Sequence, residues 1–252
     1  MRRTCLAIFG LLMLLAATAS VARRSPVPQA QPSLGDLLQE HHIELTEAAL
    51  LQALKNADSD VRFLAAMKLN DDKAADAIPK IKEALAAEQV PRARVNIALA
   101  LGLLGEPTGR NEIKHLCADK NFPSEFRLYA VRYMFDLHVE NDDDCLHAAE
   151  KTTQIVDSDY RSAGDRIIAL SLLPRFRGLT PEESKNVLQL VVARLDDPEP
   201  TVRMQAGQSL IALGDPEISL PYLEGAIPKE KDDVVRSTLE KDLEKLQQRV
   251  RK

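Results

Sequence analysis

The sequence predicts an all-α protein, an α-solenoid (superhelix) of about six stacked helix hairpins, and three observations lead to this fold class. The 252-residue chain is rich in Leu and Ala, has no Trp, and 28% of its residues are charged, a composition that favours helices over sheet. A short arginine motif recurs six times along the chain at nearly constant spacing. Amphipathic segments of helical periodicity fill the intervals between copies, so each interval has room for one hairpin.

The N-terminal segment has the order of parts found in a secretory signal peptide. Two arginines precede an apolar run from Cys5 to Ala17, and small residues follow as far as Ala22,. The run is shorter than the roughly 20 residues that a membrane-spanning helix needs. We therefore expect removal of residues 1–22 and export to the periplasm or the medium, without membrane insertion. An uncleaved leader would instead serve as an N-terminal membrane anchor.

Residues 23–33 separate the leader from the folded part. They read RRSPVPQAQPS, rich in Pro and Gln and without apolar periodicity, which is typical of a linker. The remaining residues, 34–252, are expected to form the repeat array.

The recurring motif places an apolar residue before an Arg, small or apolar residues three and four positions after it, and a large apolar residue seven positions after it. Offsets of three, four and seven lie on one face of a helix. A residue present in every unit is expected to serve the stacking between units and not to bind a ligand. The repeat arginines assigned in this way are Arg62, Arg94, Arg127, Arg161, Arg203 and Arg236.

A second amphipathic segment precedes each copy of the motif. Examples are TEAALLQAL and DAIPKIKEAL, and turn signals such as NADSD and DDPEP divide the two segments of a unit,. A single hairpin cannot bury its apolar face, so neighbouring hairpins must stack around one continuous core. The longest interval, from Arg161 to Arg203, is expected to hold its extra residues in the loop RFRGLTP.

The segment DDPEPTVRMQAGQSLIALGDP resembles the consensus of the HEAT-repeat family, in particular the short repeats of phycobilin lyases, and the resemblance covers residues 45 to 250. It implies that an Asp six residues before the Arg helps to pair neighbouring repeats, which Asp197 and Arg203 match. The other units carry Asn56, Glu88, Asn121, Ile155 and Glu230 at that position. The fourth unit departs from the pattern, and the family itself serves many different partners.

Charge and motifs exclude several classes of function. A formal net charge of −5 disfavours nucleic-acid binding, which needs a basic face. The sequence has no GxSxG, HExxH, CxxC or phosphate-binding glycine loop, so we expect no catalysis and no cofactor.

No metal site is predicted either. His41 and His42 are adjacent, and adjacent side chains on a helix diverge by about 100°. A soft-metal site built from His115, Cys117, Cys145 and His147 would need residues two positions apart to face the same way, which a helix does not allow.

Removal of the leader leaves two cysteines, Cys117 and Cys145. In an oxidising compartment they can form a disulfide. They can equally be small buried residues on separate helices, and the spacing does not decide between these alternatives.

The expected binding site lies on the helix layer that carries the arginines, because one layer of a solenoid lines its concave face. Residues two, five and six positions after each Arg should face that side. In the third unit these are Tyr129, Arg132 and Tyr133, and Arg166 occupies the column of Arg132 in the next unit. Tyr and Arg are enriched at binding hot spots. The alternative is that both rings simply cover the edge of the core.

These observations predict a non-catalytic protein–protein interaction scaffold of the cell envelope or extracellular space that binds a protein along its concave face. One alternative is a bilin-lyase-like protein that handles a tetrapyrrole, although an export signal argues against it. The other is a structural subunit of a larger complex.

Overall fold

A computed structural model describes residues 32–139, 143–154 and 160–251, and it gives only the backbone for residues 160–162. Helices dominate the described residues, which contain no strand, and the predicted all-α solenoid is confirmed. The expected leader and nearly all of the expected linker lie outside the described residues. Within the described part, no helix is both long enough and apolar enough to cross a bilayer.

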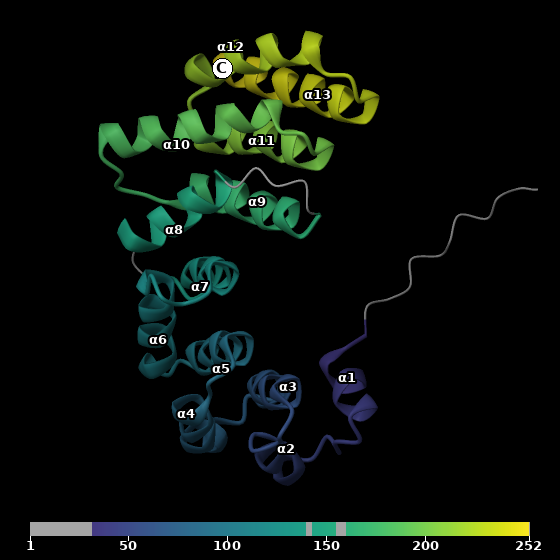
Figure 1. Cartoon of the computed structure of the whole chain (residues 1–252), viewed down its shortest axis with the longest axis vertical. Coiled ribbons are helices and arrows are strands. Elements are labelled where there is room, and N and C mark those ends of the chain that lie inside the picture. The colour runs from purple at the N-terminus through teal and green to yellow at the C-terminus, as the bar shows by residue number, and fades with distance from the viewer. Residues whose placement is uncertain (1–31, 140–142, 155–159, 252) are drawn as a thin grey trace, which may run out of the picture. The chain divides into compact units, whose positions relative to one another are not determined.

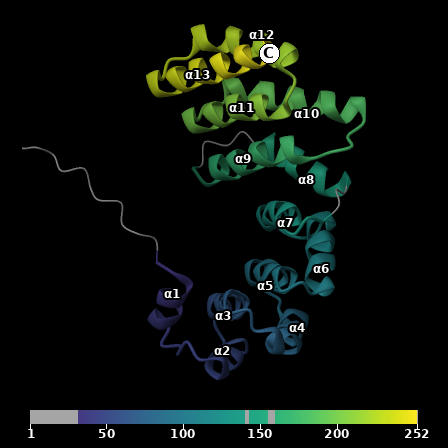
Figure 2. The same cartoon turned by 180° about the vertical axis from the view of Figure 1, so that it is seen from behind.

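A short helix, α1 (Leu34–Glu40), packs on α3 and precedes six helix hairpins. The hairpins follow one another in sequence order (Figures 1 and 2). They are α2 (Glu47–Ala53) with α3 (Ser59–Asp71), α4 (Ile78–Ala87) with α5 (Pro91–Leu103), α6 (Pro107–Ala118) with α7 (Ser124–Asp136), α8 (Asp143–Thr153) with α9 (Tyr160–Leu172), α10 (Pro181–Ala193) with α11 (Pro200–Leu213), and α12 (Pro216–Ala226) with α13 (Asp233–Val250). Single 3-10 turns occur at η1 (Ala75–Ala77), η2 (Leu173–Arg175), η3 (Arg194–Asp196) and η4 (Ile227–Lys229).

Local sequence signals explain where many of these helices begin. Proline opens α5, α6, α10, α11 and α12, at the position where a missing N–H costs nothing and its fixed φ already suits a helix. The Thr180 hydroxyl accepts a hydrogen bond from the Glu183 amide, and the Glu183 carboxylate accepts one from the Thr180 amide. This reciprocal pair satisfies two of the four free donors at a helix N-terminus.

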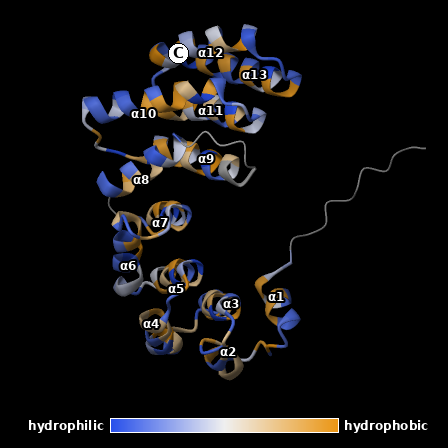
Figure 3. Ribbon diagram, in the orientation of Figure 1, coloured by the Kyte–Doolittle hydropathy of each residue, from blue (hydrophilic) through white to orange (hydrophobic). Residues whose placement is uncertain are grey.

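The core runs between the units. The second helix of each hairpin packs on the second helix of the next, from α3 through α5, α7, α9 and α11 to α13. Apolar and polar residues share each helix (Figure 3). The large apolar residue seven positions after the Arg is fully buried in four units, as Leu69, Leu101, Met134 and Leu210. Burying these side chains across unit boundaries supplies the main stabilisation of the array.

The fourth unit has a different register from the one that the sequence motif suggested. Ala169, Leu170 and Leu173 are buried and lie three, four and seven positions after Arg166. The residues three and four positions after Arg161, Gly164 and Asp165, are not buried. The repeat arginine of this unit is therefore Arg166, and the sequence alignment was wrong by five residues here. In the corrected register the extra residues fall on both sides of the unit, and not only in the RFRGLTP loop.

The second helix of the second unit, α5, meets the first helix of the third unit, α6, at glycines. A β-carbon at Gly109 of α6 would clash with the backbone of Gly102 and Ala98 in α5. Glycine at this position lets the two backbones approach closely.

Candidate functional site

A cavity of about 370 Å³ opens on the second-helix layer, across α3, α5, α7 and α9. We call it the aromatic groove. Four of its side chains are aromatic, and the others are polar or charged. Its lining residues are Phe63, Arg92, Asn96, Glu125, Phe126, Tyr129, Tyr133 and Asp165.

The aromatic side chains come from successive turns of one helix. Along α7, the ring centroids of Phe126 and Tyr129 lie 6.4 Å apart, and those of Tyr129 and Tyr133 also lie 6.4 Å apart. Offsets of three and four residues place the rings in a row on one helix face. The row gives the groove an apolar wall of half-buried rings.

Tyr133 is fixed by a hydrogen bond to the preceding unit. Its hydroxyl donates to the Asn96 Oδ1 of α5 at 2.9 Å. Burial raises the pKa of the Tyr133 phenol, so the hydroxyl stays a neutral donor over the physiological range. The bond ties the ring to the groove and leaves Tyr129 as the less restrained of the two tyrosines.

The other end of the groove carries a cation held against an aromatic ring. The guanidinium carbon of Arg92 lies 5.1 Å from the ring centroid of Phe63, within the range of a cation–π contact. Arg92 also pairs with Asp60 at 3.4 Å. Phe63 and Arg92 belong to consecutive units, so this contact links α3 to α5 beside the groove.

Two of the four predicted binding residues lie in the groove and two do not. Tyr129 and Tyr133 line the groove, whereas Arg132 is exposed and pairs with Asp136 at 3.9 Å on its own helix. Arg166 was assigned to the exposed column but is completely buried. This assignment is wrong, because it followed the misplaced register of the fourth unit.

The prediction that residues two, five and six positions after each Arg face the binding side also needs one correction. The residue six positions after the Arg faces the preceding unit: Ala100 and Ser209 are buried there. The Ser209 hydroxyl donates to the Leu170 carbonyl of α9 at 2.8 Å. The hydrogen bond from Tyr133 to Asn96 follows the same direction.

The repeat arginines bind carboxylates in the next unit. Arg62 donates from Nε to Glu88 at 2.6 Å, and Arg203 donates from Nε to Glu230 at 2.7 Å. Each guanidinium also donates a second bond to the other carboxylate oxygen of the same partner. Such paired hydrogen bonds fix the geometry as well as the charge. Each acceptor lies six residues before the Arg of its own unit, so this position joins successive units.

The resemblance to HEAT repeats implied that the Asp197 side chain pairs with Arg203, but the structure shows a different partner. Arg203 Nη1 donates to the backbone carbonyl of Asp197 at 2.9 Å. The Asp197 carboxylate accepts from Arg166 at 3.0 Å and from Arg194 at 3.5 Å. The acidic residue therefore contacts the arginine of the preceding unit with its side chain and the arginine of its own unit with its backbone.

Three repeat arginines have other partners. Arg94 pairs with Glu112 of α6 at 2.7 Å, because the next acceptor position holds Asn121. Arg127 donates to the carbonyl of Cys117 at 3.0 Å within its own unit. The C-terminal Arg236 bonds the carbonyl of Glu230 and the carboxylate of Asp233. The side chain of Arg161 lies outside the described atoms.

The inter-unit carboxylates are held in their charged form. The hydrogen bond from Arg203 lowers the pKa of Glu230 to about 2 against the opposing effect of burial, and backbone N–H groups lower it further. Burial of Glu88 opposes its ionisation, but the bonds from Arg62 and the Val90 amide outweigh this, and its pKa is lowered. Both carboxylates also accept the backbone amide of the residue that caps the following helix, Val90 before α5 and Asp232 before α13.

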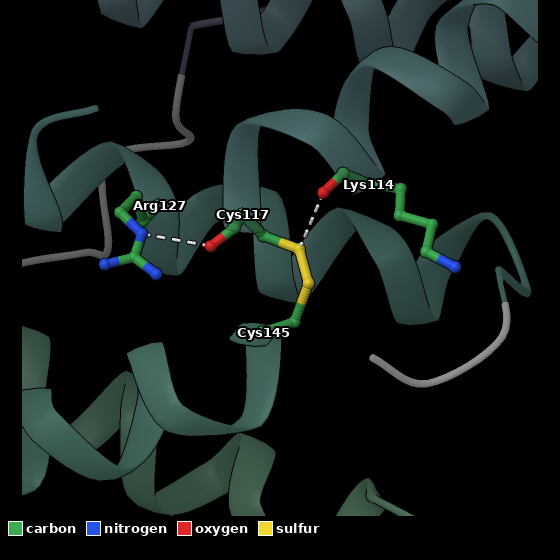
Figure 4. Close-up of a disulfide and its surroundings, with 4 residues drawn as sticks. All are labelled: Lys114, Cys117, Arg127 and Cys145. Carbon is green, nitrogen blue, oxygen red and sulfur yellow. Dashed lines mark hydrogen bonds between the residues drawn. A yellow bond between two sulfur atoms is a disulfide. The ribbon is translucent and has the colours of Figure 1, made fainter. Parts of the chain in front are cut away.

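Cys117 and Cys145, whose pairing the sequence does not decide, are joined by a disulfide. Cys117 of α6 and Cys145 of α8 lie with their Cα atoms 5.1 Å apart, and both are fully buried (Figure 4). The linkage uses both thiols that a His–Cys metal site would need. Among the described residues, no group of three or more His, Cys, Asp and Glu could hold a metal ion.

Sequence reasoning identified two of the groove aromatics and missed the others. Phe126 directly precedes Arg127 and Phe63 directly follows Arg62, so neither lies two, five or six positions after a repeat arginine. A recognisable signal was present in the segment FRLYAVRYM, whose three aromatic side chains at offsets of three and four share one helix face. What this groove offers is an apolar, aromatic contact surface with charged ends.

Comparisons with known proteins identify the repeats. Residues 47–132 and 161–244 match the family described as HEAT repeats. Among solved structures, an engineered protein is similar at 18% identity, over 79% of this chain and 57% of that chain, with a TM-score of 0.42. The chain thus spans little more than half of that protein. Human deoxyhypusine hydroxylase in complex with glycerol is similar at 20% identity, over 80% of this chain and 84% of that chain, with a TM-score of 0.29. No protein of curated function matches the sequence.

Proposed function

Because the chain belongs to the HEAT-repeat family, whose members are commonly scaffolds for protein interactions, we propose that it is a non-catalytic module that binds a protein partner in the aromatic groove. The family is typically non-catalytic, and the groove holds apolar rings in place of a nucleophile and its base. The observation that carries the proposal is the convergence of Phe63, Phe126, Tyr129 and Tyr133 on one cavity.

The shape and chemistry of the groove favour an extended segment of a partner. Its lining comes from four successive units, so an occupant must run across the helices and not along one of them. Half-buried aromatic rings give a large contact area with little loss of side-chain entropy, which is why they are enriched at hot spots. The Asn96 amide and the Glu125 carboxylate lie beside the rings and can hydrogen-bond the backbone of such a segment.

A selection experiment tests this proposal. A library of displayed random peptides is selected against the purified protein, and the binding of the enriched peptides to the double variant Phe126→Ala/Tyr129→Ala is then measured. We expect enriched peptides to bind the wild type and the variant Tyr222→Ala, since Tyr222 is an exposed tyrosine on α12, outside the groove. Enriched peptides that bind all three proteins equally would place the binding surface elsewhere.

We further propose that the protein acts outside the cytoplasm. The leader-like sequence of residues 1–22 supports export, and so does a buried disulfide, because disulfides persist mainly in oxidising compartments. N-terminal sequencing of the mature protein from the periplasm or the medium tests this directly. We expect the sequence to begin at Ser20 or Arg23. Recovery of the protein only as a membrane-bound form that retains Met1 would contradict cleavage.

A further inference from the structure

Within the described residues, four of the five interfaces between units contain a close arginine–carboxylate pair. The pairs join the first unit to the second, the second to the third, the fourth to the fifth, and the fifth to the sixth. They are Arg62–Glu88, Arg94–Glu112, Arg166–Asp197 and Arg203–Glu230. Their carboxylates are mostly or fully buried, so each pair is shielded from solvent and from salt.

The interface between the third and fourth units is built differently. Its arginine, Arg127, is buried but donates to a carbonyl of its own unit. Within the described atoms, the Arg127 Nη2 has no hydrogen-bond acceptor. The position six residues before Arg166 holds Tyr160, which has no carboxylate to offer. Among the residues that the structure describes, Arg127 therefore has no carboxylate partner in the next unit, unlike the arginines of the other four interfaces.

Two ion pairs between described residues cross this interface, and both are more exposed than the pairs of the other interfaces. Lys120 pairs with Asp144 at 3.7 Å, and Arg175 pairs with Asp136 at 3.7 Å. All four side chains are more than one third exposed, and exposed pairs of this length contribute little to stability.

The disulfide crosses this same interface. Cys117 belongs to the first helix of the third unit and Cys145 to the first helix of the fourth. Figure 4 shows the linkage beside Arg127, which bonds the Cys117 carbonyl. We propose that the disulfide replaces the missing inter-unit ion pair and holds the two halves of the array together, so that the array separates at this interface when the disulfide is reduced.

Dithiothreitol can reduce the disulfide. Dithiothreitol supplies two electrons and two protons: the S–S bond of the protein breaks into two thiols, and the reagent closes to its cyclic disulfide. The covalent link between α6 and α8 is lost, while the ion pairs of the other interfaces are unaffected. Opening should then begin in the middle of the chain.

Hydrogen–deuterium exchange on the full chain, before and after reduction, tests the proposal. We expect amides of α6 to α9 to exchange faster by on the order of a hundredfold after reduction, whereas amides of α3 and α13 should change little. The variant Cys117→Ala/Cys145→Ala should reproduce the pattern without reagent, which covers the case of a disulfide too buried to be reduced.

Two control variants separate this effect from general destabilisation. Glu230→Gln breaks the pair of the last interface and should speed exchange in α12 and α13 instead. Lys120→Ala removes an exposed pair at the central interface and should leave exchange unchanged. The proposal is overturned if the Cys117→Ala/Cys145→Ala variant speeds exchange evenly along the chain or nowhere, or if thiol labelling of the protein purified without reductant finds Cys117 and Cys145 as free thiols.

Discussion

Arg166 and Asp197 form an ion pair at 3.0 Å in which both side chains are completely buried. The pair joins α9 to the turn before α11, two elements of successive units. Its place between successive units is the counterpart of Arg62 with Glu88 and of Arg203 with Glu230, which identifies Arg166 as the repeat arginine of the fourth unit.

Double-mutant cycles can test this register. Loss of one member removes the nearest opposite charge from a buried ion, so Arg166→Met or Asp197→Ala should each lower the free energy of unfolding by about 3–5 kcal/mol. The cycle of the two should show strong coupling in denaturant unfolding.

The cycle of Asp197→Ala with Arg203→Ala is the control, and it should be additive within about 0.5 kcal/mol. Arg203 bonds the backbone carbonyl of residue 197, which Asp197→Ala retains. Stronger coupling in the second cycle would restore the register suggested by the sequence.

Acid should weaken the last interface. The pKa of Glu230 is lowered from its ordinary 4.5 to about 2 in the folded protein. A lowered pKa stabilises the folded state above the pKa of the unfolded chain, and the contribution disappears as the pH falls from about 4.5 to about 2. It amounts to at most about 3 kcal/mol at neutral pH. Urea unfolding of the wild type and Glu230→Gln should give a difference that shrinks across this window.

The exposed Glu240 of α13 provides the matched control for this titration. Glu240→Gln should follow the wild type at every pH. A Glu230→Gln protein whose stability changes with pH as steeply as that of the wild type would show that other carboxyls dominate acid unfolding.

The close contact of α5 with α6 depends on a missing side chain. Gly109→Ala would place a methyl group against the backbone of Gly102 and Ala98, and we expect a loss of about 1–3 kcal/mol in stability from overpacking. Gly164→Ala in α9 meets open space and should be neutral or stabilising by up to about 1 kcal/mol, because alanine is the better helix former. Thermal unfolding of both variants compares them directly. Equal melting temperatures would mean that the two helices can separate at little cost.

The fold could be predicted from the sequence because the repeat imposes one pattern six times. An apolar residue seven positions after Arg62, Arg94 or Arg203 is buried in every case, and single departures do not hide a periodic signal. The fourth unit was misassigned because YRSAGDRII and the true segment DRIIALSLL overlap, and both place an Arg before small residues. Spacing alone could not decide between them, whereas burial of Arg166 does.

The candidate site was predictable only in part, for a geometric reason. Tyr129 and Tyr133 share a helix face, which periodicity reveals. Phe63 and Asp165 reach the groove from other units, and their meeting depends on how the units stack. The acceptor of each repeat arginine lies on another unit for the same reason, so Asp197 was paired with its neighbour in sequence and not with its neighbour in space.

The most direct test of partner binding in the aromatic groove is a comparison of dissociation constants. One peptide enriched by the selection is measured against three proteins that have similar melting temperatures. Fluorescence polarisation would compare the wild type, Tyr129→Ala and Tyr222→Ala. We predict that Tyr129→Ala weakens binding by about 2–4 kcal/mol, the usual cost of removing a central aromatic anchor, and that Tyr222→Ala binds as the wild type does. Unchanged affinity of a folded Tyr129→Ala protein would contradict the claim.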